Sequence, residues 1–428
     1  MSSVAKLTLL FVVFVDLIGQ GLVFPIINAL IMEPGTGFLP VHTSAAERHF
    51  YYGLVIGSFF LAWFLGVVYV AKLSDSIGRR NALLICLFGA LAGYAITIVA
   101  LVVNSMWLLI LGRAITGFTA GNQPVATAAM IDGSRNDADR DQNMGYIVTG
   151  VSFGLVAGPI IGGLLSDKAI IGRDASLQLP FYAAGVLVVI AILLVLAFFK
   201  DVRQEREPFV FRAFDVLESL WQVTRHPLVM RILPVYTFFM IANVTFYIFI
   251  DNYLTSAFGY GVIGGSVAML VIGVALAVSS TFLVKPAQQR FDKRQIVRAS
   301  VIVMLICSIA IALSPIAWLC YVPVFFFYFL FGVSYPTILG IFSSSVDAKD
   351  QGWVMGVTTA VFCLAGGVMS LIGGGLMNID IRLPYYVSGA AAFIALIALY
   401  VTWNSAEIRR LTGRAAEGST PDTTRRGK

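Results

Sequence analysis

The sequence GLVAGPIIGGLL, residues 154–165, carries four glycines and a proline inside an apolar run of membrane-helix length. Its end returns in the second half of the chain as IGGGLM, residues 372–377, and DQNMGYIVTG at 141–150 returns as DQGWVMGVTT at 350–359. At one constant offset, the aligned pairs are Gly145 with Gly356, Gly162 with Gly373, and Gly163 with Gly374. This repeat predicts two related halves with a central binding site between them.

The composition places the chain in a membrane. It has 428 residues, of which 58% are hydrophobic and 12% charged, with a mean hydropathy of +0.87, and soluble domains are far more polar. Runs of about 20 apolar residues are long enough to span a bilayer. The predicted fold is an all-α integral membrane protein with twelve spans in two pseudo-symmetric six-helix bundles. The spans are 7–31, 51–72, 81–103, 106–131, 143–165, 179–199, 232–253, 262–284, 298–315, 317–345, 353–377 and 384–404.

The polar segments divide the chain into four parts. We expect an N-terminal bundle at 1–199, a cytoplasmic linker at 200–231, a C-terminal bundle at 232–404 and a disordered tail at 405–428. Within the linker, RAFDVLESLWQVTRH at 212–226 places Phe214, Leu217 and Trp221 on one helical face between basic ends. This pattern predicts an amphipathic helix on the inner leaflet.

The distribution of basic residues predicts the orientation. Of the 29 Lys and Arg residues, 24 fall on one side of this topology, four fall on the other, and Arg113 lies within a span. Basic residues concentrate in cytoplasmic loops, so both termini are expected in the cytoplasm. The net charge of +6 follows from this topology, and we assign no nucleic-acid partner to it.

Other chemistries find no support in the sequence. The chain has no G-x-x-x-x-G-K-[ST] phosphate loop, so ATP is not expected to drive it. Its three histidines lie in loops without metal-ligand spacing, and its four cysteines lie in separate spans as apolar packing residues. We predict no catalytic residue, no metal site and no cofactor, and therefore no enzyme.

The loop after the second span carries a specific resemblance. AKLSDSIGRR, residues 71–80, resembles the G-x-L-x-D-R-x-G-R-R loop of the major facilitator superfamily, with Ala71 and Ser76 at the two departures. The resemblance covers nearly the whole chain and implies a cytoplasmic gate. Its residues are Asp75, Gly78, Arg79 and Arg80, with Asp132 as the partner expected by analogy. The alternative is an ordinary positive-inside anchor.

Two charged residues lie inside spans. Arg113 in the fourth span resembles the family's R-x-x-x-G motif, which is associated with proton coupling; a structural arginine bonded to backbone carbonyls is the alternative. Asp16, in VDLIGQGLVFP at 15–25 with Gln20 one turn later, resembles the first helix of tetracycline-type efflux proteins. Burial favours the neutral form of a carboxylate, which suits a proton carrier. A carboxylate that caps a helix is the alternative.

Further polar and aromatic side chains are candidates for the central cavity. Asp251, near the outer end of the seventh span, is a second acid that coupling or a simple interface position explains equally well. The other candidates, for each of which helix packing is the alternative, are Asn122, Gln123, Asn243, Tyr247 and Tyr335.

The opening segment matches the antiporter motif of the same superfamily at every fixed position. The matching residues are Gly145, Gly154, Gly158, Pro159, Gly162 and Gly163. The stripe of small residues every fourth position allows close helix approach, and we expect it to pack against the eighth span and close the periplasmic side. Helix packing alone is the alternative explanation for the glycines.

The resemblance implies a drug:proton antiporter that exports a drug-like or amphiphilic small molecule by alternating access, driven by the proton gradient. We expect a multi-pass monomer in a bacterial inner membrane. Two other hypotheses remain open from the sequence: a proton-coupled transporter of a siderophore or metabolite, including an importer, and a non-transporting membrane sensor. The substrate itself is not encoded in any motif.

Overall fold

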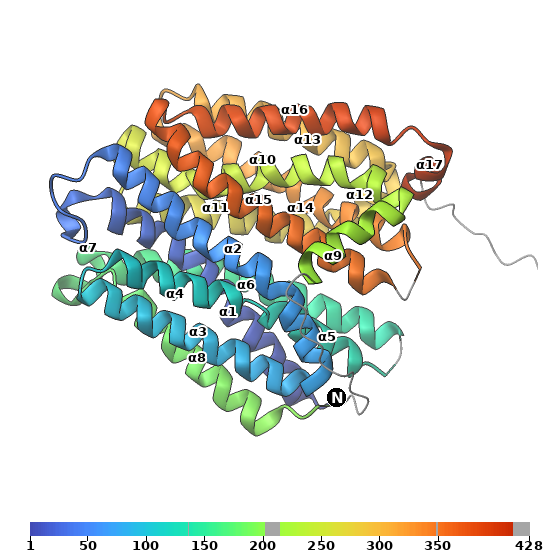
Figure 1. The fold of residues 1–428 in the computed structure, drawn as a ribbon, viewed down its shortest axis with the longest axis horizontal. Helices are drawn as coiled ribbons and strands as arrows, with labels where there is room; N and C mark the ends of the chain where they lie inside the picture. The colour runs from blue at the N-terminus through green and yellow to red at the C-terminus, as the bar shows by residue number, and fades with distance from the viewer. Residues whose placement is uncertain (136, 202–214, 348–349, 414–428) are drawn as a thin grey trace, which may run out of the picture.

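The computed structural model describes all residues except 136, 202–214, 348–349 and 414–428, and every regular element in the described residues is a helix. Two bundles, one from each half of the chain, lie side by side (Figure 1). The first contains α1 (Ser3–Met32), α2 (Ala45–Ile77), α3 (Arg79–Val102), α4 (Met106–Phe118), α5 (Asn122–Asp132), α6 (Asp137–Ser166) and α8 (Leu179–Phe198). The second contains α10 (Pro227–Phe258), α11 (Val262–Phe282), α13 (Lys293–Ala312), α14 (Tyr321–Ser344), α15 (Gln351–Ile379) and α16 (Leu383–Thr402). The shorter helices are α7 (Lys168–Ile171), α9 (Asp215–Gln222), α12 (Val284–Arg290) and α17 (Ala406–Thr412).

The fourth predicted span differs from the others because it is broken. In the described residues, 11 helices are long and apolar enough to cross a membrane, and the span at 106–131 is divided between α4 and α5. Gly121 has non-helical dihedral angles, and Pro124 follows in the first turn of α5. Proline has no amide hydrogen to donate back across the break, so the helix restarts there. Counted as one crossing, α4 and α5 complete the twelve-span, two-bundle fold that the sequence predicts.

Local capping extends several helices beyond the predicted apolar runs. A capping box between Ser44 and Glu47 starts α2 before its apolar run begins. α10 begins at Pro227, inside the segment predicted as linker, because proline is well tolerated at the start of a helix. Gly78, with φ of 94°, separates α2 from α3, and a positive φ is strained for residues with a side chain.

The sequence predicted a disordered tail from residue 405 onwards. The structure instead has a short helix at the start of this segment. Ser405 caps α17, and its hydroxyl accepts a hydrogen bond from the amide of Ile408. Ile408 is fully buried, and α17 contacts α14. An N-cap and one buried apolar side chain therefore hold a short helix that composition alone does not reveal. Residues 414–428 of the predicted tail lie outside the described residues.

The predicted amphipathic helix at 212–226 is α9 followed by a 3-10 turn, Val223–Arg225; residues 202–214 lie outside the described part of the chain. Trp353 on α15 donates a hydrogen bond from Nε1 to the Ser219 carbonyl at 3.1 Å. The rings of Trp353 and His226 also lie 4.6 Å apart. These contacts attach α9 and the following turn to the end of the second bundle, while Trp221 remains exposed.

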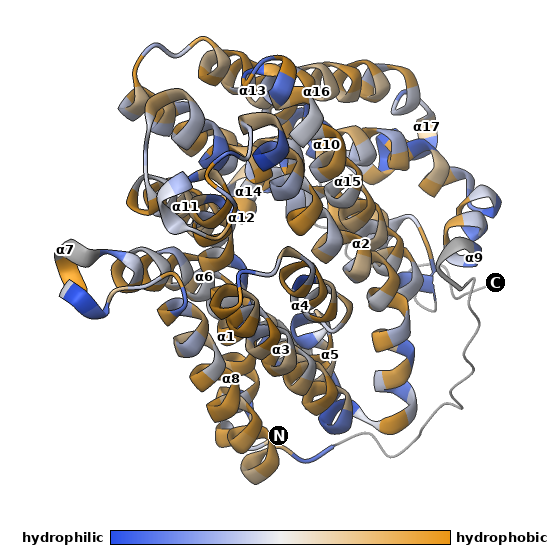
Figure 2. Cartoon of the chain, turned by 60° about the vertical axis from the view of Figure 1, so that its left-hand side comes forward, coloured by the Kyte–Doolittle hydropathy of each residue, from blue (hydrophilic) through white to orange (hydrophobic). Residues whose placement is uncertain are grey.

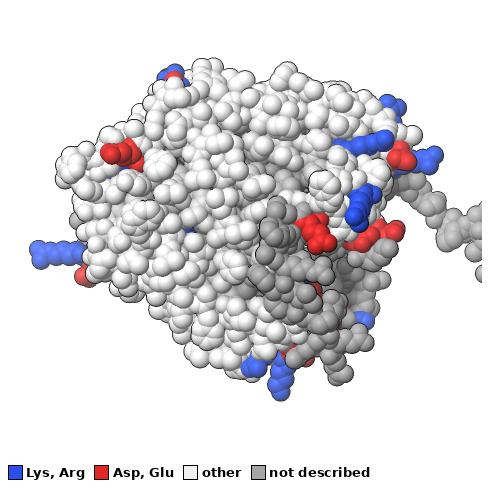
Figure 3. All heavy atoms as spheres, viewed as in Figure 1, with Lys and Arg blue, Asp and Glu red and all other residues white. Residues whose placement is uncertain are grey.

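The surface of the molecule matches a lipid environment. Orange, apolar residues cover the long helices in Figure 2, and the face in Figure 3 is uncharged across a wide middle region, with Lys, Arg, Asp and Glu gathered towards the ends of the helices. Large apolar side chains such as Phe153 and Leu193 are exposed. Exposed apolar side chains are favourable in hydrocarbon, where the helices satisfy their own backbone groups.

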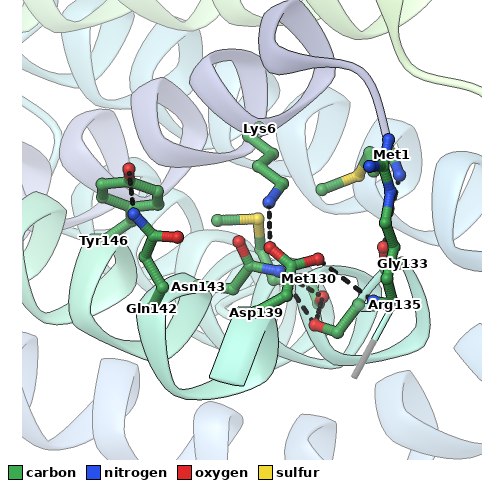
Figure 4. Close-up of polar contacts among 10 residues, drawn as sticks. Met1, Lys6, Met130, Gly133, Arg135, Asp139, Gln142, Asn143 and Tyr146 are labelled. Atoms are coloured by element: carbon green, nitrogen blue, oxygen red, sulfur yellow. Dashed lines mark hydrogen bonds and ion pairs between the residues drawn. The ribbon is translucent and has the colours of Figure 1, made fainter. Parts of the chain in front are cut away.

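The start of α1 is attached to the loop between α5 and α6 (Figure 4). Lys6 Nζ lies 2.6 Å from Asp139 Oδ1, and the Arg135 amide donates to Asp139 Oδ2 at 3.0 Å. The hydrogen bond from Lys6 holds the pKa of Asp139 below its ordinary value. Asn143 also donates to the Met130 carbonyl. This polar cluster fixes α1 and α6 to each other at the end that carries the N-terminus.

Candidate functional site

A cavity of about 970 Å³ lies between the two bundles. Eight of the nine residues predicted for the central site line it, namely Asp16, Gln20, Arg113, Asn122, Gln123, Asn243, Tyr247 and Tyr335. The predicted charged and amide side chains come almost entirely from the first bundle. The ninth residue, Asp251, does not line the cavity.

The break in the fourth span places an amide beside the acid of the first span. Asn122 is the first residue of α5, and its Nδ2 donates to Asp16 Oδ1 at 3.3 Å. Asn122 is itself buried. Gln20, one turn after Asp16, lines the same cavity. The acid is thus held by an amide whose position depends on an interrupted helix.

Arg113 is a buried cation, only 4% exposed. Its Cζ lies 4.3 Å from the centre of the Phe59 ring, a cation–π distance. Arg113 Nε has no hydrogen-bond partner, and no described acid lies within ion-pair distance of the guanidinium. The side chain lines the cavity, so its charge is available to a ligand.

Tyr94 is a cavity residue that the sequence analysis missed. Its hydroxyl lies against Gly19 of α1, where a Cβ would overlap it, and the side chain lines the cavity. A tyrosine in the apolar third span gives no functional signal by itself. Its position becomes informative only in the folded bundle, where its hydroxyl reaches Gly19 of α1.

Aromatic side chains form much of the remaining wall. On α14, the rings of Phe331 and Tyr335 stack at 5.3 Å, and Tyr328 lies 6.0 Å from Phe331. Tyr247 of α10 contacts Phe24 of α1 edge-on at 4.9 Å, which joins the bundles at one end of the cavity. Such a wall suits planar and apolar groups.

A second aromatic group lies where α2 faces α15. Trp63 contacts Phe59 and, edge-on at 5.6 Å, Phe362 of α15. All three line the cavity. Trp63 Nε1 has no hydrogen-bond partner among the described residues, so it offers one donor within an otherwise apolar surface. Aromatic residues are too common in this chain for their sequence positions to indicate the wall.

The predicted gate residues lie at the end of the cavity. Arg79 Nη1 lies 2.8 Å from Asp75 Oδ1, and Arg79 Nε lies 2.9 Å from Asp132 Oδ2. The expected partner of Arg79 is therefore in place. All three residues belong to the first bundle, so these two ion pairs connect α2 and α3 with α5.

The other half of the loop motif is held by a residue that the sequence did not single out. The Arg80 amide donates to Asp201 Oδ1 at 2.9 Å, and Arg80 Nη2 donates to the Leu196 carbonyl at 2.7 Å. A Cβ on Gly78 would overlap the Asp201 carboxylate. Gly78 is thus required both by its positive φ and by the approach of Asp201 from the end of α8.

The cavity extends towards one end of the molecule only. Its lining continues to Asp75 and Arg79 and to Ser219 of α9. At the opposite end the bundles are in contact: Tyr52 donates to the Ile248 carbonyl at 2.6 Å, and Asn28 donates to Thr255 Oγ1 at 2.7 Å. Among the described residues, the cavity therefore reaches the end with the gate loop, and the bundles are in contact at the other end, hereafter the outer end.

The outer end is closed by backbone-to-backbone packing of α2 and α15. A Cβ on Gly53 of α2 would overlap the Ser370 carbonyl oxygen of α15, and a Cβ on Gly374 would lie 2.5 Å from the His49 carbonyl oxygen. Small residues permit such close helix approach. Separating the bundles at this end requires these two helices to part.

The glycine stripe of α6 packs mainly against α1. The expected contact of α6 with the eighth span, α11, is made largely outside the stripe, where Gly273 of α11 lies against the Leu155 backbone. A Cβ on Gly158 would lie 2.7 Å from the Ile18 carbonyl oxygen, and one on Gly154 would lie 2.7 Å from that of Phe14. Gly162 faces Leu22 of the same helix, whereas Gly163 faces Ser266 of α11. Residues four apart share a helix face, while the next residue is turned by about 100°. Gly145 has nothing near its Cβ position, and Pro159 lines the cavity.

Asp251 lies in the closed outer interface. It is fully buried, and its carboxylate lies against Gly265 of α11. It lies near the C-terminal end of α10, and its side chain is directed towards packed helices. The structure therefore separates it from Asp16 and the cavity.

Comparisons with known proteins agree with this geometry. The sequence model of the Major Facilitator Superfamily matches residues 9–370. The chain is 29% identical to the class C tetracycline resistance protein of Escherichia coli, over 85% of this chain and 87% of that protein. It is 22% identical to the quinolone resistance protein NorA of Staphylococcus aureus, over 92% and 95%. In fold, it is similar to a D-xylose-proton symporter, with a TM-score of 0.73 and 14% identity over 94% of this chain and 98% of that one.

Proposed function

Because the chain belongs to the major facilitator superfamily, we propose that this multi-pass membrane transporter is a proton-coupled antiporter that exports an amphiphilic, drug-like molecule. The relatives are transporters, and the chain is likewise a transporter of small molecules and not an enzyme. The observation that carries the proposal is the contact of Asp16 with Asn122 in the wall of the cavity. It puts one proton-binding group where a ligand also binds.

The two walls of the cavity bind different parts of the substrate. The aromatic wall of α10 and α14 binds the apolar part of the substrate, while Asp16, Gln20 and Asn122 bind its polar part. Arg113 adds a cation that has no acidic partner among the described residues. A buried carboxylate prefers its protonated form, and an approaching polar or cationic group favours the ionised form. Substrate binding therefore promotes release of the proton from Asp16.

The orientation follows from the basic residues. With the gate loop and both termini in the cytoplasm, the structure is the inward-open state of an inner-membrane carrier. Substrate and the departing proton use the same cytoplasmic opening. Rocking of the bundles then opens the outer end, where the substrate leaves and a periplasmic proton binds, so the proton gradient drives export. A monomer suffices, because each bundle of one chain supplies one wall.

Proteoliposomes test this proposal with tetracycline and a fluoroquinolone as the two probes. We expect either probe to drive proton movement through the wild-type protein and not through Asp16→Asn. Arg113→Ala is expected to reduce the proton movement that each of the two probes drives. Asp380→Asn, in an exposed outer turn, is the matched control and should behave as wild type. Probe-driven proton movement that is unchanged in Asp16→Asn contradicts the coupling.

Membrane vesicles of defined sidedness test the direction. Under an imposed pH gradient, an exporter accumulates the probe in inverted vesicles and an importer accumulates it in right-side-out vesicles. Accumulation only in right-side-out vesicles would replace export by import.

A further inference from the structure

The outer interface contains a buried acid that the transport cavity does not use. Asp251 is 0% exposed, and neither of its carboxylate oxygens has a hydrogen-bond partner in the described residues. Buried polar groups are normally hydrogen-bonded, and a buried ionised carboxylate without a partner is strongly disfavoured. The packing of this site is therefore compatible with a neutral carboxylic acid.

A second acid, from the other bundle, approaches the same end of α11. Asp251 Oδ1 occupies the space that a Cβ on Gly265 would need, and Glu33 Oε1 lies 3.6 Å from the Cβ position of Gly261, one turn earlier in α11. Glu33 ends α1 in the first bundle. Asp251 thus lies where an acid from each bundle meets the start of α11, and like charges there oppose each other.

The other ionisable groups around Asp251 do not neutralise it. Tyr52 of α2 and Tyr321 of α14 face the same region, and their hydroxyls donate to the carbonyls of Ile248 and Gly264. His49 lies beside Asn252. The buried cation at the start of α2, Arg48, has backbone partners of its own. Arg48 donates from its guanidinium to the carbonyls of Ile31, Pro40 and Thr43.

We propose that Asp251 is a second proton-binding site, which controls closure of the outer gate and is separate from the transport site at Asp16. The bundles close at the outer end when Asp251 is protonated. When they part, α10 and α11 expose the carboxylate to water, where the ionised form is stable. No bond forms or breaks other than the O–H bond of the acid, and the proton comes from the outer aqueous phase.

The inference extends the proposed function and rests on it for the direction of the cycle. A carrier that has released its substrate outside returns to the inward-open state after protonation of Asp251 from the periplasm. Acidic external medium therefore favours closure, independently of the protonation state of Asp16. Gly265 supports this role because any larger residue there would displace the carboxylate from the closed interface.

Distance measurements between the outer ends of the bundles test the site without measuring transport. Val41 and Ile379 are 80% and 79% exposed, one on the outer side of each bundle. Val41→Cys and Ile379→Cys receive spin labels in a full-length protein whose four buried cysteines are replaced by alanine. In liposomes from pH 6 to pH 8.5, the ratio of open to closed outer ends should rise with pH, by at most about tenfold per unit for one proton.

The variants test the site at Asp251 directly. Asp251→Asn should keep the outer end closed at every pH, while Asp380→Asn should keep the wild-type response. Glu33→Gln removes the second acid, and should reduce the response without abolishing it. A wild-type response in Asp251→Asn, or an equal loss in Asp380→Asn, overturns the proposal. If Asp251→Asn does not insert, Asp251→Ser provides the same neutral test. If probe–proton antiport fails while the outer-end distances still respond to pH, the result contradicts the proposed function and not the second site.

Discussion

Asn122 Nδ2 lies 3.3 Å from Asp16 Oδ1, so the first residue of α5 holds the acid of α1. Asn122→Leu keeps the approximate size of the side chain and removes the donor. A hydrogen bond to a charged group contributes about 1.5–3 kcal/mol, so we expect at least about a tenfold slower probe-driven proton movement. Proton flux in proteoliposomes measures it. Asn404→Ala, at an exposed position, should retain the wild-type rate, and an equal loss in both variants would contradict the assignment.

Phe59 covers the guanidinium of Arg113 at 4.3 Å. In Phe59→Leu, the buried cation loses its aromatic partner, at a cost of up to about 2 kcal/mol. We expect a lower melting temperature in detergent and weaker probe binding, with recovery of both in Phe59→Tyr. Phe153→Leu is the control because Phe153 is lipid-facing and 65% exposed. If Phe59→Leu and Phe153→Leu have the same effect, the ring contact with Arg113 is unimportant.

The antiporter motif should divide into tolerant and intolerant glycines. At Gly158 an added Cβ would lie 2.7 Å from the Ile18 carbonyl oxygen, whereas at Gly145 nothing lies within 4 Å. Overpacking costs about 1–3 kcal/mol, so Gly158→Ala should lower the melting temperature and slow exchange. Gly145→Ala should be nearly neutral. Thermal unfolding and exchange assays compare the two, and equal sensitivity would show that the motif does not act through contact with α1.

Pro159 tests the missing backbone donor inside α6 separately from the glycine contacts. Pro159→Leu restores the backbone donor that the proline lacks and changes a side chain that lines the cavity. We expect the variant to insert and to exchange the probe poorly or leakily. Proton leak without probe and exchange with probe are measured on the same liposomes. Wild-type values in both assays would limit Pro159 to a packing role.

Arg79 makes two ion pairs, with Asp75 at 2.8 Å and with Asp132 at 2.9 Å. Both pairs are partly accessible to solvent, and solvent-accessible ion pairs contribute only about 0–1 kcal/mol each, so Arg79→Ala should change the global melting temperature little. It should nevertheless slow exchange, because the gate loop loses its attachment to α5. A double-mutant cycle with Asp132→Asn measures the coupling, expected at about 1 kcal/mol or less. Additive effects on exchange would show that the two residues act separately.

The cluster at Lys6 predicts a pH effect on stability. The hydrogen bond from Lys6 lowers the pKa of Asp139 in the folded protein. A lowered folded-state pKa stabilises the protein above the ordinary Asp pKa of about 4, and this stabilisation is lost as pH falls through the folded-state pKa. Asp139→Asn should therefore have a lower melting temperature than the wild type at pH 7. The difference between the two melting temperatures should shrink below about pH 4. A constant difference across that range would contradict the ion pair's contribution.

Much of the site was visible in the sequence because it depends on charge within apolar runs. Asp16 and Arg113 are conspicuous there because a charge in a membrane span is costly, and both line the cavity. The break that positions Asn122 was not predicted, since hydropathy remains high through Gly121 and Pro124. Aromatic wall residues such as Tyr94 and Trp63 were also missed, because they resemble ordinary packing residues until two helices face each other.

The sequence by itself determined the twelve crossings, the two repeated halves, the gate loop and the antiporter motif, because hydropathy and residue spacing are properties of the chain. Only the tertiary structure decided which surfaces meet. It turned the glycine stripe towards α1, directed Asp251 into the outer interface and brought Asp201 to Gly78. Helix faces repeat about every four residues, so the sequence defines a face, but the packing of the bundles determines what that face contacts.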